Sequence, residues 1–358
     1  MPPDHAPDHA PAAGPTRPRT ATAWWTVAPG RGELRAHPLR PPGPGEVTVR
    51  TLFSGISRGT ERLVHAGLVP PGHTGRMRAP FQHGDLPSPV SYGYLAVGEV
   101  LEGPAEVLGR QVFVLHPHHD RFVVPVQAVH PLPDGVPARR AVLAGTVETA
   151  LNVLWDAGVR IGDRVLVVGG GAVGACVARL AGGVPGTRVE LVDPYPGRAA
   201  TAAVLGVGYR HPDELAGDEH VGRADVVVHT SATASGLALA LRLAPDDGEV
   251  VEASWFGTQA PAVPLGEDVH VRRVSIRASQ VGAVALARRG RRTTSDRLDL
   301  ALRLLADPAF EHLLGADVPF ADLPARMSGL LGLDEDGDGS GDGGRAGDGR
   351  CSVVRYTP

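Results

Sequence analysis

The chain has 358 residues, of which 42% are hydrophobic and 21% charged, and its formal net charge is −4. This length accommodates two domains with a core each, and this composition is typical of a globular protein. The segment 334–350 holds six acidic residues and two arginines, so it accounts for the whole net charge. Because the remainder is close to neutral, we expect a small-molecule substrate and neither a nucleic-acid nor a membrane partner.

The residue types present exclude several kinds of chemistry. The two cysteines, Cys176 and Cys351, are too few for a disulfide framework or a four-thiolate zinc site. The chain contains no lysine, which removes Schiff-base chemistry and a phosphate-binding P-loop lysine. Residues 1–20 are rich in Pro, His and Ala, and we expect a disordered tail that is neither a secretory signal nor a transit peptide. A cytoplasmic location is the corresponding expectation.

Short apolar runs separated by turns follow this tail and predict an antiparallel, barrel-like β region up to about residue 130. The strands expected there cover 46–57, 94–103, 110–117 and 121–133. A helix is expected over 139–158, where apolar residues recur at spacings of three and four.

From residue 164 onward, expected strands and helices alternate. The strands are expected at 164–170, 188–194, 224–230, 248–257 and 274–280, and the helices at 172–183, 197–206 and 235–244. Such an alternation predicts a parallel sheet that helices cover on both faces. Two more helical segments, 296–307 and 321–333, and a final strand at 351–356 complete the expected elements.

The most specific motif is the run VLVVGGGAVGACVARL, which joins the strand at 164–170 to the helix that follows. Gly169, Gly171 and Gly174 form the pattern G-x-G-x-x-G, in which the first glycine permits a tight turn, the second lets the backbone approach a pyrophosphate, and the third allows close helix–strand packing. The helix N-terminus, with Ala172 and Val173, would offer free N–H groups to the phosphates. This context predicts a dinucleotide site.

Asp193 ends the next expected strand, about twenty residues further on, where a carboxylate accepts hydrogen bonds from the adenosine ribose hydroxyls. An acid at this position repels a 2′-phosphate, so NAD is favoured as the cofactor. Arg198 could pair with such a phosphate, so NADP stays possible. The structural alternative is that Asp193 only begins a turn with Pro194.

From residue 21 to the end, this order of a β-rich part, a dinucleotide-binding part and a C-terminal return resembles the medium-chain dehydrogenase/reductase superfamily. The resemblance implies an α/β fold with a GroES-like catalytic domain at 21–149 and 283–358 and a Rossmann domain, a doubly wound parallel sheet, at 150–282. It also implies homodimers built by pairing Rossmann sheets edge to edge. The wording SGISRGTE is similar in particular to the branch around bacteriochlorophyllide a dehydrogenase and to bacterial proteins labelled zinc-binding alcohol dehydrogenases although their ligands are lost.

Superfamily members that use zinc bind it through the Cys of G-[IV]-C-G-T-D, the His of G-H-E and a Cys or Asp at the start of the linking helix. The matching positions here are Ser57, Tyr94 and either Gly145 or Thr146, and none of these side chains replaces a thiolate or an imidazole. The lobe that binds structural zinc through four cysteines has no cysteine in this chain. We therefore expect no zinc and no metal ligands.

Hydride transfer without zinc still needs an acid or base and a group that polarises the reacting oxygen. The resemblance puts Tyr94 beside the reacting carbon, where its phenol would donate a proton. Glu61 would orient a substrate hydroxyl or act through water, and Ser57 and Thr60 are hydrogen-bond donors on the same loop. The structural alternatives are a packed tyrosine, a carboxylate paired with a neighbouring arginine, and ordinary turn residues.

The resemblance also puts Thr149 near the nicotinamide and Glu148 beside the same cleft, although both would equally suit the first turn of a helix. In the segment HPHHD, residues 116–120, adjacent side chains of an extended chain point to opposite faces, so we expect a polar loop lining the cleft rather than a metal site. An unconventional metal site built from His116, His118 or His65 stays open. Asp334, Asp336 and Asp338 have the spacing of a calcium loop, but Arg345 occupies the position of the bidentate Glu, so a flexible acidic insertion is expected.

These observations together predict a zinc-independent, NAD(P)-dependent oxidoreductase that interconverts a secondary alcohol and a ketone on a small organic substrate. An enzymatic alternative is an NADPH-dependent reductase of activated C=C bonds, of the enoyl or quinone type. A third hypothesis is a protein that binds the dinucleotide as a sensor or scaffold without turnover.

Overall fold

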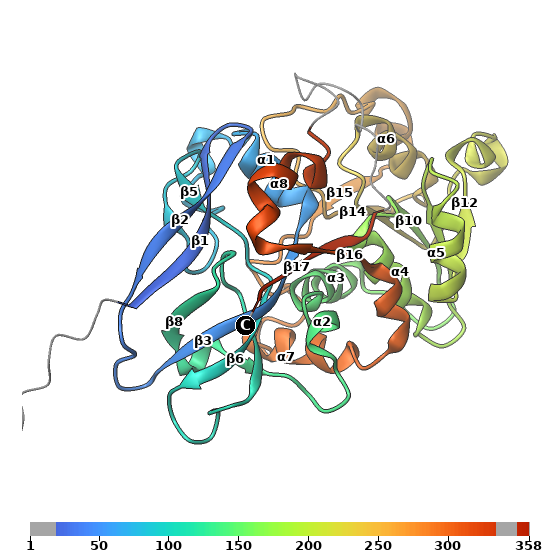
Figure 1. Ribbon diagram of the computed structural model, residues 1–358. Coiled ribbons are helices and arrows are strands. Elements are labelled where there is room, and N and C mark those ends of the chain that lie inside the picture. Colours follow the sequence, from blue (N-terminus) through green and yellow to red (C-terminus); the bar gives the residue numbers. More distant parts are fainter. Residues whose placement is uncertain (1–18, 334–348, 358) are drawn as a thin grey trace, which may run out of the picture.

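The computed structural model describes residues 19–333 and 349–357. The expected tail, apart from its last two residues, and nearly all of the acidic insertion lie outside these described residues. Three β-sheets organise the described part of the chain (Figure 1). In Figure 1 the β-rich part lies at the left and the parallel sheet at the right, with α3 between them.

The six-stranded sheet has the strand order β12-β11-β10-β13-β14-β15, and all of its pairings are parallel. Its strands are β10 (Arg164–Val168), β11 (Arg188–Val192), β12 (Gly208–Arg210), β13 (Val226–His229), β14 (Glu249–Glu252) and β15 (Ser275–Ala278). The chain leaves β10 in one direction and returns on its other side at β13, which is the doubly wound order of a Rossmann domain. The predicted parallel sheet is confirmed, and the switch of direction beside β10 is where such sheets bind ligands.

Helices cover both faces of this sheet, as predicted. They are α4 (Ala172–Gly182), α5 (Arg198–Leu205) and α6 (Ala234–Leu243). Alternate residues of β10 enter different cores: Val165 and Val167 pack with α4 and α5, whereas Leu166 and Val168 pack with α6. A strand buried on both sides needs apolar residues at every position, which explains the continuous run that the sequence shows there.

The β-rich part contains the other two sheets. One has the order β16-β17-β3-β6-β7-β9, with β8 paired to β3, and the other has the order β2-β1-β5-β4. The strands of the larger sheet are β3 (Glu46–Ile56), β6 (Ala96–Glu102), β7 (Gln111–Val114), β8 (Arg121–Pro125), β9 (His130–Pro131), β16 (Leu314–Pro319) and β17 (Cys351–Arg355). Those of the smaller sheet are β1 (Arg19–Ala28), β2 (Arg31–Leu39), β4 (His83–Gly84) and β5 (Val90–Ser91). Because β17 pairs with β3, the predicted C-terminal return to the β-rich part is confirmed.

The helix expected over 139–158 is present in two pieces, α2 (Ala138–Ala141) and α3 (Ala144–Ala157). Residues of α3 share one core with β-rich residues such as Phe113 and with Val165 of the parallel sheet, so α3 joins the two parts. The predicted domain boundary at residues 149 and 150 falls inside α3, and the division into domains stays a prediction. The C-terminal helices are α7 (Thr294–Leu304) and α8 (Leu323–Leu331), close to the expected ranges.

One helix was not expected. The segment that the sequence suggested as a loop continues from β3 into α1 (Arg58–His65), which packs beside α8. Ser57 is its N-cap residue, and its backbone N–H donates to the Glu61 carboxylate in the first turn of the helix. The helix is too short for its apolar period to stand out in the sequence. Among the described residues, no helix combines the length and apolar character that crossing a membrane requires.

Candidate functional site

The glycine loop lies where β10 ends and α4 begins. Gly169 has φ of +115°, and a Cβ there would lie 2.6 Å from the backbone nitrogen of Ser231. A Cβ on Gly174 would overlap the carbonyl oxygen of Gly169, so this glycine is required for helix–strand packing. Gly171, the N-cap of α4, has open space where its Cβ would be. Neighbouring atoms thus fill the space beside Gly169 and Gly174, whereas the space beside Gly171 is open to a ligand. This is the geometry expected of a loop that binds a pyrophosphate.

Asp193 links the end of β11 to this loop. One carboxylate oxygen accepts from the backbone N–H of Gly170 at 2.7 Å, and the other accepts from that of Tyr195 at 2.9 Å. The turn suggested as the structural alternative is thus present, and it fixes the carboxylate beside the glycine loop. The Arg198 guanidinium lies 3.9 Å from the same carboxylate and 5.9 Å from the centre of the Tyr195 ring. Both side chains considered for recognising the adenosine ribose therefore lie together.

The side chains at two of the zinc-ligand positions contact each other. The Tyr94 phenol donates a hydrogen bond of 2.6 Å to the Ser57 hydroxyl, which joins the segment before β6 to the start of α1. Burial raises the pKa of Tyr94 to about 12, although hydrogen bonding with Ser57 and Thr60 lowers it. The phenol therefore stays protonated at neutral pH and acts as a donor.

Glu61 is buried and pairs with a histidine. Its carboxylate accepts from the Ser57 backbone N–H at 2.8 Å and lies 2.9 Å from Nε2 of His118. Both oxygens are engaged, so these contacts fix the position of the Glu61 carboxylate. Each carboxylate oxygen can accept a second hydrogen bond, so the expected contact with a substrate hydroxyl stays a prediction.

The sequence suggested His118 only as a candidate metal ligand and did not indicate its contact with Glu61. It is fully buried, its Nδ1 lies 2.7 Å from the Ser54 hydroxyl, and that hydroxyl lies 2.9 Å from the phenol of Tyr356. The expectation of a polar loop lining the cleft is wrong, because His116, His118 and His119 are all buried. A Cβ on Gly93, beside Tyr94, would lie 2.7 Å from the His118 ring, so Gly93 leaves room for it.

Glu148 does not stand free beside a cleft, which corrects that expectation. Its carboxylate accepts from Nε of Arg297 at 3.0 Å and from a terminal nitrogen at 2.9 Å, and the Arg297 side chain is fully buried. Burial raises the pKa of Glu148, and the charge of Arg297 opposes that rise. The pair joins α3 to α7. The Thr149 hydroxyl donates a hydrogen bond of 2.9 Å to the carbonyl of Gly145 in the same helix.

The donors at the zinc-ligand positions do not fit a zinc ion. The Ser57 hydroxyl already accepts from Tyr94, and a Cβ on Gly145 would lie 2.6 Å from a methyl carbon of Leu95. The hydroxyl groups of Ser57, Tyr94 and Thr146 are all weaker zinc donors than a thiolate or an imidazole.

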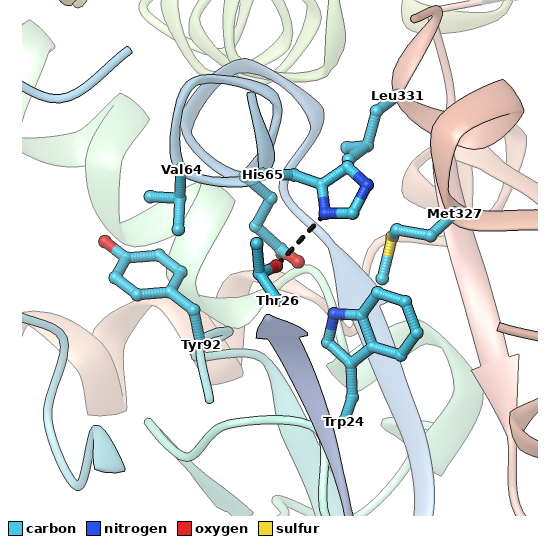
Figure 2. Close-up of a pocket in the computed structure, with 8 residues that line it drawn as sticks. Trp24, Thr26, Val64, His65, Tyr92, Met327 and Leu331 are labelled. Carbon is cyan, nitrogen blue, oxygen red and sulfur yellow. Dashed lines mark hydrogen bonds between the residues drawn. The ribbon is translucent and has the colours of Figure 1, made fainter. Parts of the chain in front are cut away.

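A cavity of about 10 Å³ lies next to Glu61 (Figure 2). Trp24, Thr26, Glu61, Val64, His65, Tyr92, Met327 and Leu331 line it. This volume holds about one water molecule and excludes a substrate. Both ring nitrogens of His65 have hydrogen-bond partners there. Nδ1 lies 3.0 Å from the Thr26 hydroxyl, and Nε2 lies 3.4 Å from the Ser328 hydroxyl. His65 therefore does not join His116 or His118 at a metal site.

A second network, also missed, lies at the carboxyl ends of β13 and β14. Buried His229 has Nδ1 2.6 Å from the Glu252 carboxylate and Nε2 2.7 Å from the Ser231 hydroxyl. Because Ser231 also approaches Gly169, this network flanks the glycine loop. No sequence pattern marks it, since its members come from separate strands.

No protein-family model matches the chain. Over 201 residues the chain is 26% identical to a D-guloside 3-dehydrogenase of Shigella flexneri, and the aligned part is 51% of this chain and 57% of that protein. The chain thus spans little more than half the length of this curated relative.

The fold is similar to that of a Sinorhizobium meliloti 1021 protein described as a zinc-binding dehydrogenase and solved with NADP. The TM-score is 0.72 at 17% identity, over 94% of this chain and 99% of that one. An Escherichia coli CFT073 protein described as a short chain alcohol dehydrogenase and solved with NADH gives a TM-score of 0.69 at 17% identity, over 95% of this chain and 99% of that one. At such identities the likeness establishes the fold, and the predicted class, an α/β protein with GroES-like and Rossmann parts, is confirmed.

Proposed function

We propose that the chain is a medium-chain dehydrogenase/reductase that interconverts a secondary alcohol and a ketone with a nicotinamide dinucleotide, and that it needs no zinc at the reacting centre. The observation that carries this proposal is the hydrogen bond between Tyr94 and Ser57 in a fold that also holds the glycine loop. The partial identity to a D-guloside dehydrogenase favours a polar, hydroxylated substrate.

The cofactor, when bound, supplies or accepts the hydride. The open side of Gly171 and the N-terminus of α4 would bind its pyrophosphate, and Asp193 would bind its adenosine ribose. The acid at Asp193 favours NAD, and Arg198 leaves NADP within reach.

At the reacting centre, the Tyr94 O–H would turn from Ser57 toward the carbonyl oxygen of a ketone and donate its proton there. The Ser57 hydroxyl would then donate to the phenol oxygen and hold it in place. Glu61 fixes the Ser57 backbone, and His118 fixes Glu61. Because burial disfavours the tyrosinate, Tyr94 suits the acid role of ketone reduction better than the base role of alcohol oxidation.

We propose a homodimer that forms through the outer edge of the parallel sheet. All residues of the edge strand β15 are exposed. Val271, Ile276 and Leu286, which lie on or flank this strand in the sequence, are 75%, 41% and 71% exposed. An exposed edge with apolar side chains is suited to pairing with a second copy.

The proposal is tested on full-length protein dialysed against a chelator. Fluorescence titration with NADH and NADPH should show saturable binding with NADH preferred, and a panel of ketones, secondary alcohols and enones should show turnover on ketones or alcohols. Turnover on enones with NADPH would identify a C=C reductase instead. Tight NADH binding without any turnover would favour the sensor hypothesis, and activity that returns only with added zinc would contradict zinc independence.

A further inference from the structure

We propose that His37, His83 and His119 form a binding site for a divalent transition-metal ion of the zinc class, separate from the Tyr94–Ser57 centre. One ring nitrogen from each of the three residues lies within 4.8 Å of the others. Within residues 19–333 and 349–357, no other group of three or more His, Cys, Asp or Glu side chains has ligand atoms gathered in this way.

The three histidines come from different elements of the β-rich part. His37 is on β2, His83 begins β4, and His119 forms an isolated bridge with Ala23 of β1. The ring centres of His37 lie 4.4 Å from His83 and 5.1 Å from His119, and those of His83 and His119 lie 5.4 Å apart. Three imidazoles that face one another across a small sheet are a ligand set that zinc, copper and nickel accept.

His119 supplies an independent observation. Its side chain is 1% exposed, and its Nε2 lies 2.9 Å from the Ser91 hydroxyl. Its Nδ1 is buried and has no hydrogen-bond partner. A buried polar atom without a partner is unfavourable, and a metal ion on Nδ1 would satisfy it. The bond to Ser91 is then the outer-shell contact that usually fixes the orientation of a metal-binding imidazole.

The charge state of the cluster also suits a metal. Burial lowers the pKa of all three histidines, most strongly that of His119. Imidazole binds a metal ion in its neutral form, so the ligands are ready at neutral pH.

Binding a metal ion would require a modest movement of the three imidazole rings. Zinc–nitrogen bonds of about 2.0–2.1 Å put tetrahedral ligand atoms roughly 3.3 Å apart, so the rings must approach one another. His37 and His83 are only partly buried, and β4 has two residues, so both side chains have room to move. Their partial exposure also leaves the fourth position to a water molecule. A bound ion would join β2 and β4 to the 116–119 segment, and His118 in that segment holds Glu61.

The experiment uses the full chain, stripped with a chelator and titrated with Co²⁺ and then Zn²⁺. We expect about one equivalent of metal per chain by elemental analysis, the visible d–d bands of tetrahedral Co²⁺, and a higher Tm with Zn²⁺. His83→Ala and His37→Ala should each lose the bands and the rise in Tm while the apo proteins keep their circular dichroism.

The controls are His73→Ala, which removes an exposed histidine elsewhere, and the double variant His5→Ala/His9→Ala, which removes the N-terminal histidines. Both should keep the bands. The proposal is overturned if stripped protein binds no stoichiometric metal, if His83→Ala and His37→Ala bind as the parent does, or if the His5/His9 variant alone abolishes binding.

Discussion

Tyr94 donates a 2.6 Å hydrogen bond to Ser57, so two positions that the superfamily resemblance matches to zinc ligands are joined here by a direct contact between hydroxyl groups. A zinc ion would polarise a carbonyl oxygen by its charge. In this chain the same oxygen would meet a phenol that burial keeps protonated. The proposed chemistry changes accordingly from metal-assisted to acid-assisted hydride transfer.

Removing the phenol tests this role. Tyr94→Phe should lower kcat by about 10²- to 10⁴-fold, the usual contribution of a positioned general acid, and should leave the Kd for NADH unchanged. Ser57→Ala should lower kcat less, because the phenol remains. Steady-state kinetics and fluorescence titration measure both quantities. Full activity of Tyr94→Phe would remove the residue from the mechanism.

The glycine loop offers a matched pair of variants. Gly171→Ala adds a Cβ in open space and should keep the parent's free energy of unfolding, while NADH binds about tenfold or more weakly, a loss of about 1.4 kcal/mol or more. Gly174→Ala adds a Cβ that overlaps the Gly169 carbonyl and should cost about 1–3 kcal/mol of stability. Urea unfolding and NADH titration separate the two effects. An unchanged Kd for NADH in Gly171→Ala would show that the space at Gly171 is not a ligand site.

Cofactor choice should depend on the charge of Asp193. Asp193→Asn keeps an oxygen for the Gly170 N–H but removes the repulsion of a 2′-phosphate, so the NADPH-to-NADH affinity ratio should rise about tenfold or more. Asp163→Asn is the matched control, because its carboxylate accepts from the Arg160 N–H in a turn that precedes β10. An unchanged ratio in Asp193→Asn would exclude this carboxylate from cofactor recognition.

The buried pair of Arg297 and Glu148 should matter for stability. Arg297→Met leaves the Glu148 carboxylate buried without its partner and should cost about 3–5 kcal/mol in the free energy of unfolding. The double variant Arg297→Met/Glu148→Leu should recover part of this loss. Arg78→Met, which breaks the exposed pair with Asp85, should cost about 1 kcal/mol or less. If Arg297→Met cost no more than Arg78→Met, the pair would have no structural role.

Stability should fall at alkaline pH. Burial raises the pKa of Tyr94 and of Cys351, each to about 12, from ordinary values of 10.0 and 9.0. A pKa raised by folding contributes stability that is complete below the ordinary pKa and is lost as pH rises through the folded-state value. In urea unfolding, the contribution of these two groups to the free energy of unfolding should therefore be constant up to about pH 8–9 and should decline steadily from there toward pH 12. Tyr94→Phe should flatten the decline, and an equal slope in that variant would contradict the assignment.

The sequence by itself determined most of the elements and the glycine loop. The alternation from β10 to β15, the helices between them and the spacing of Gly169, Gly171 and Gly174 are local patterns, and local patterns follow from backbone and burial preferences within a few residues. Even the turn at Asp193 lies within one short segment. For the same reason, the loss of the usual zinc donors at Ser57 and Tyr94 was visible without a structure.

Only the tertiary structure decided which side chains meet. His118 reaches Glu61, Arg297 reaches Glu148, and the three histidines of the proposed metal site converge from separate segments of the chain. No periodicity encodes such pairs, because each depends on how two distant segments pack and on which buried polar groups then need a partner. The helix α1 belongs with them, since its short apolar face is defined by packing against α8.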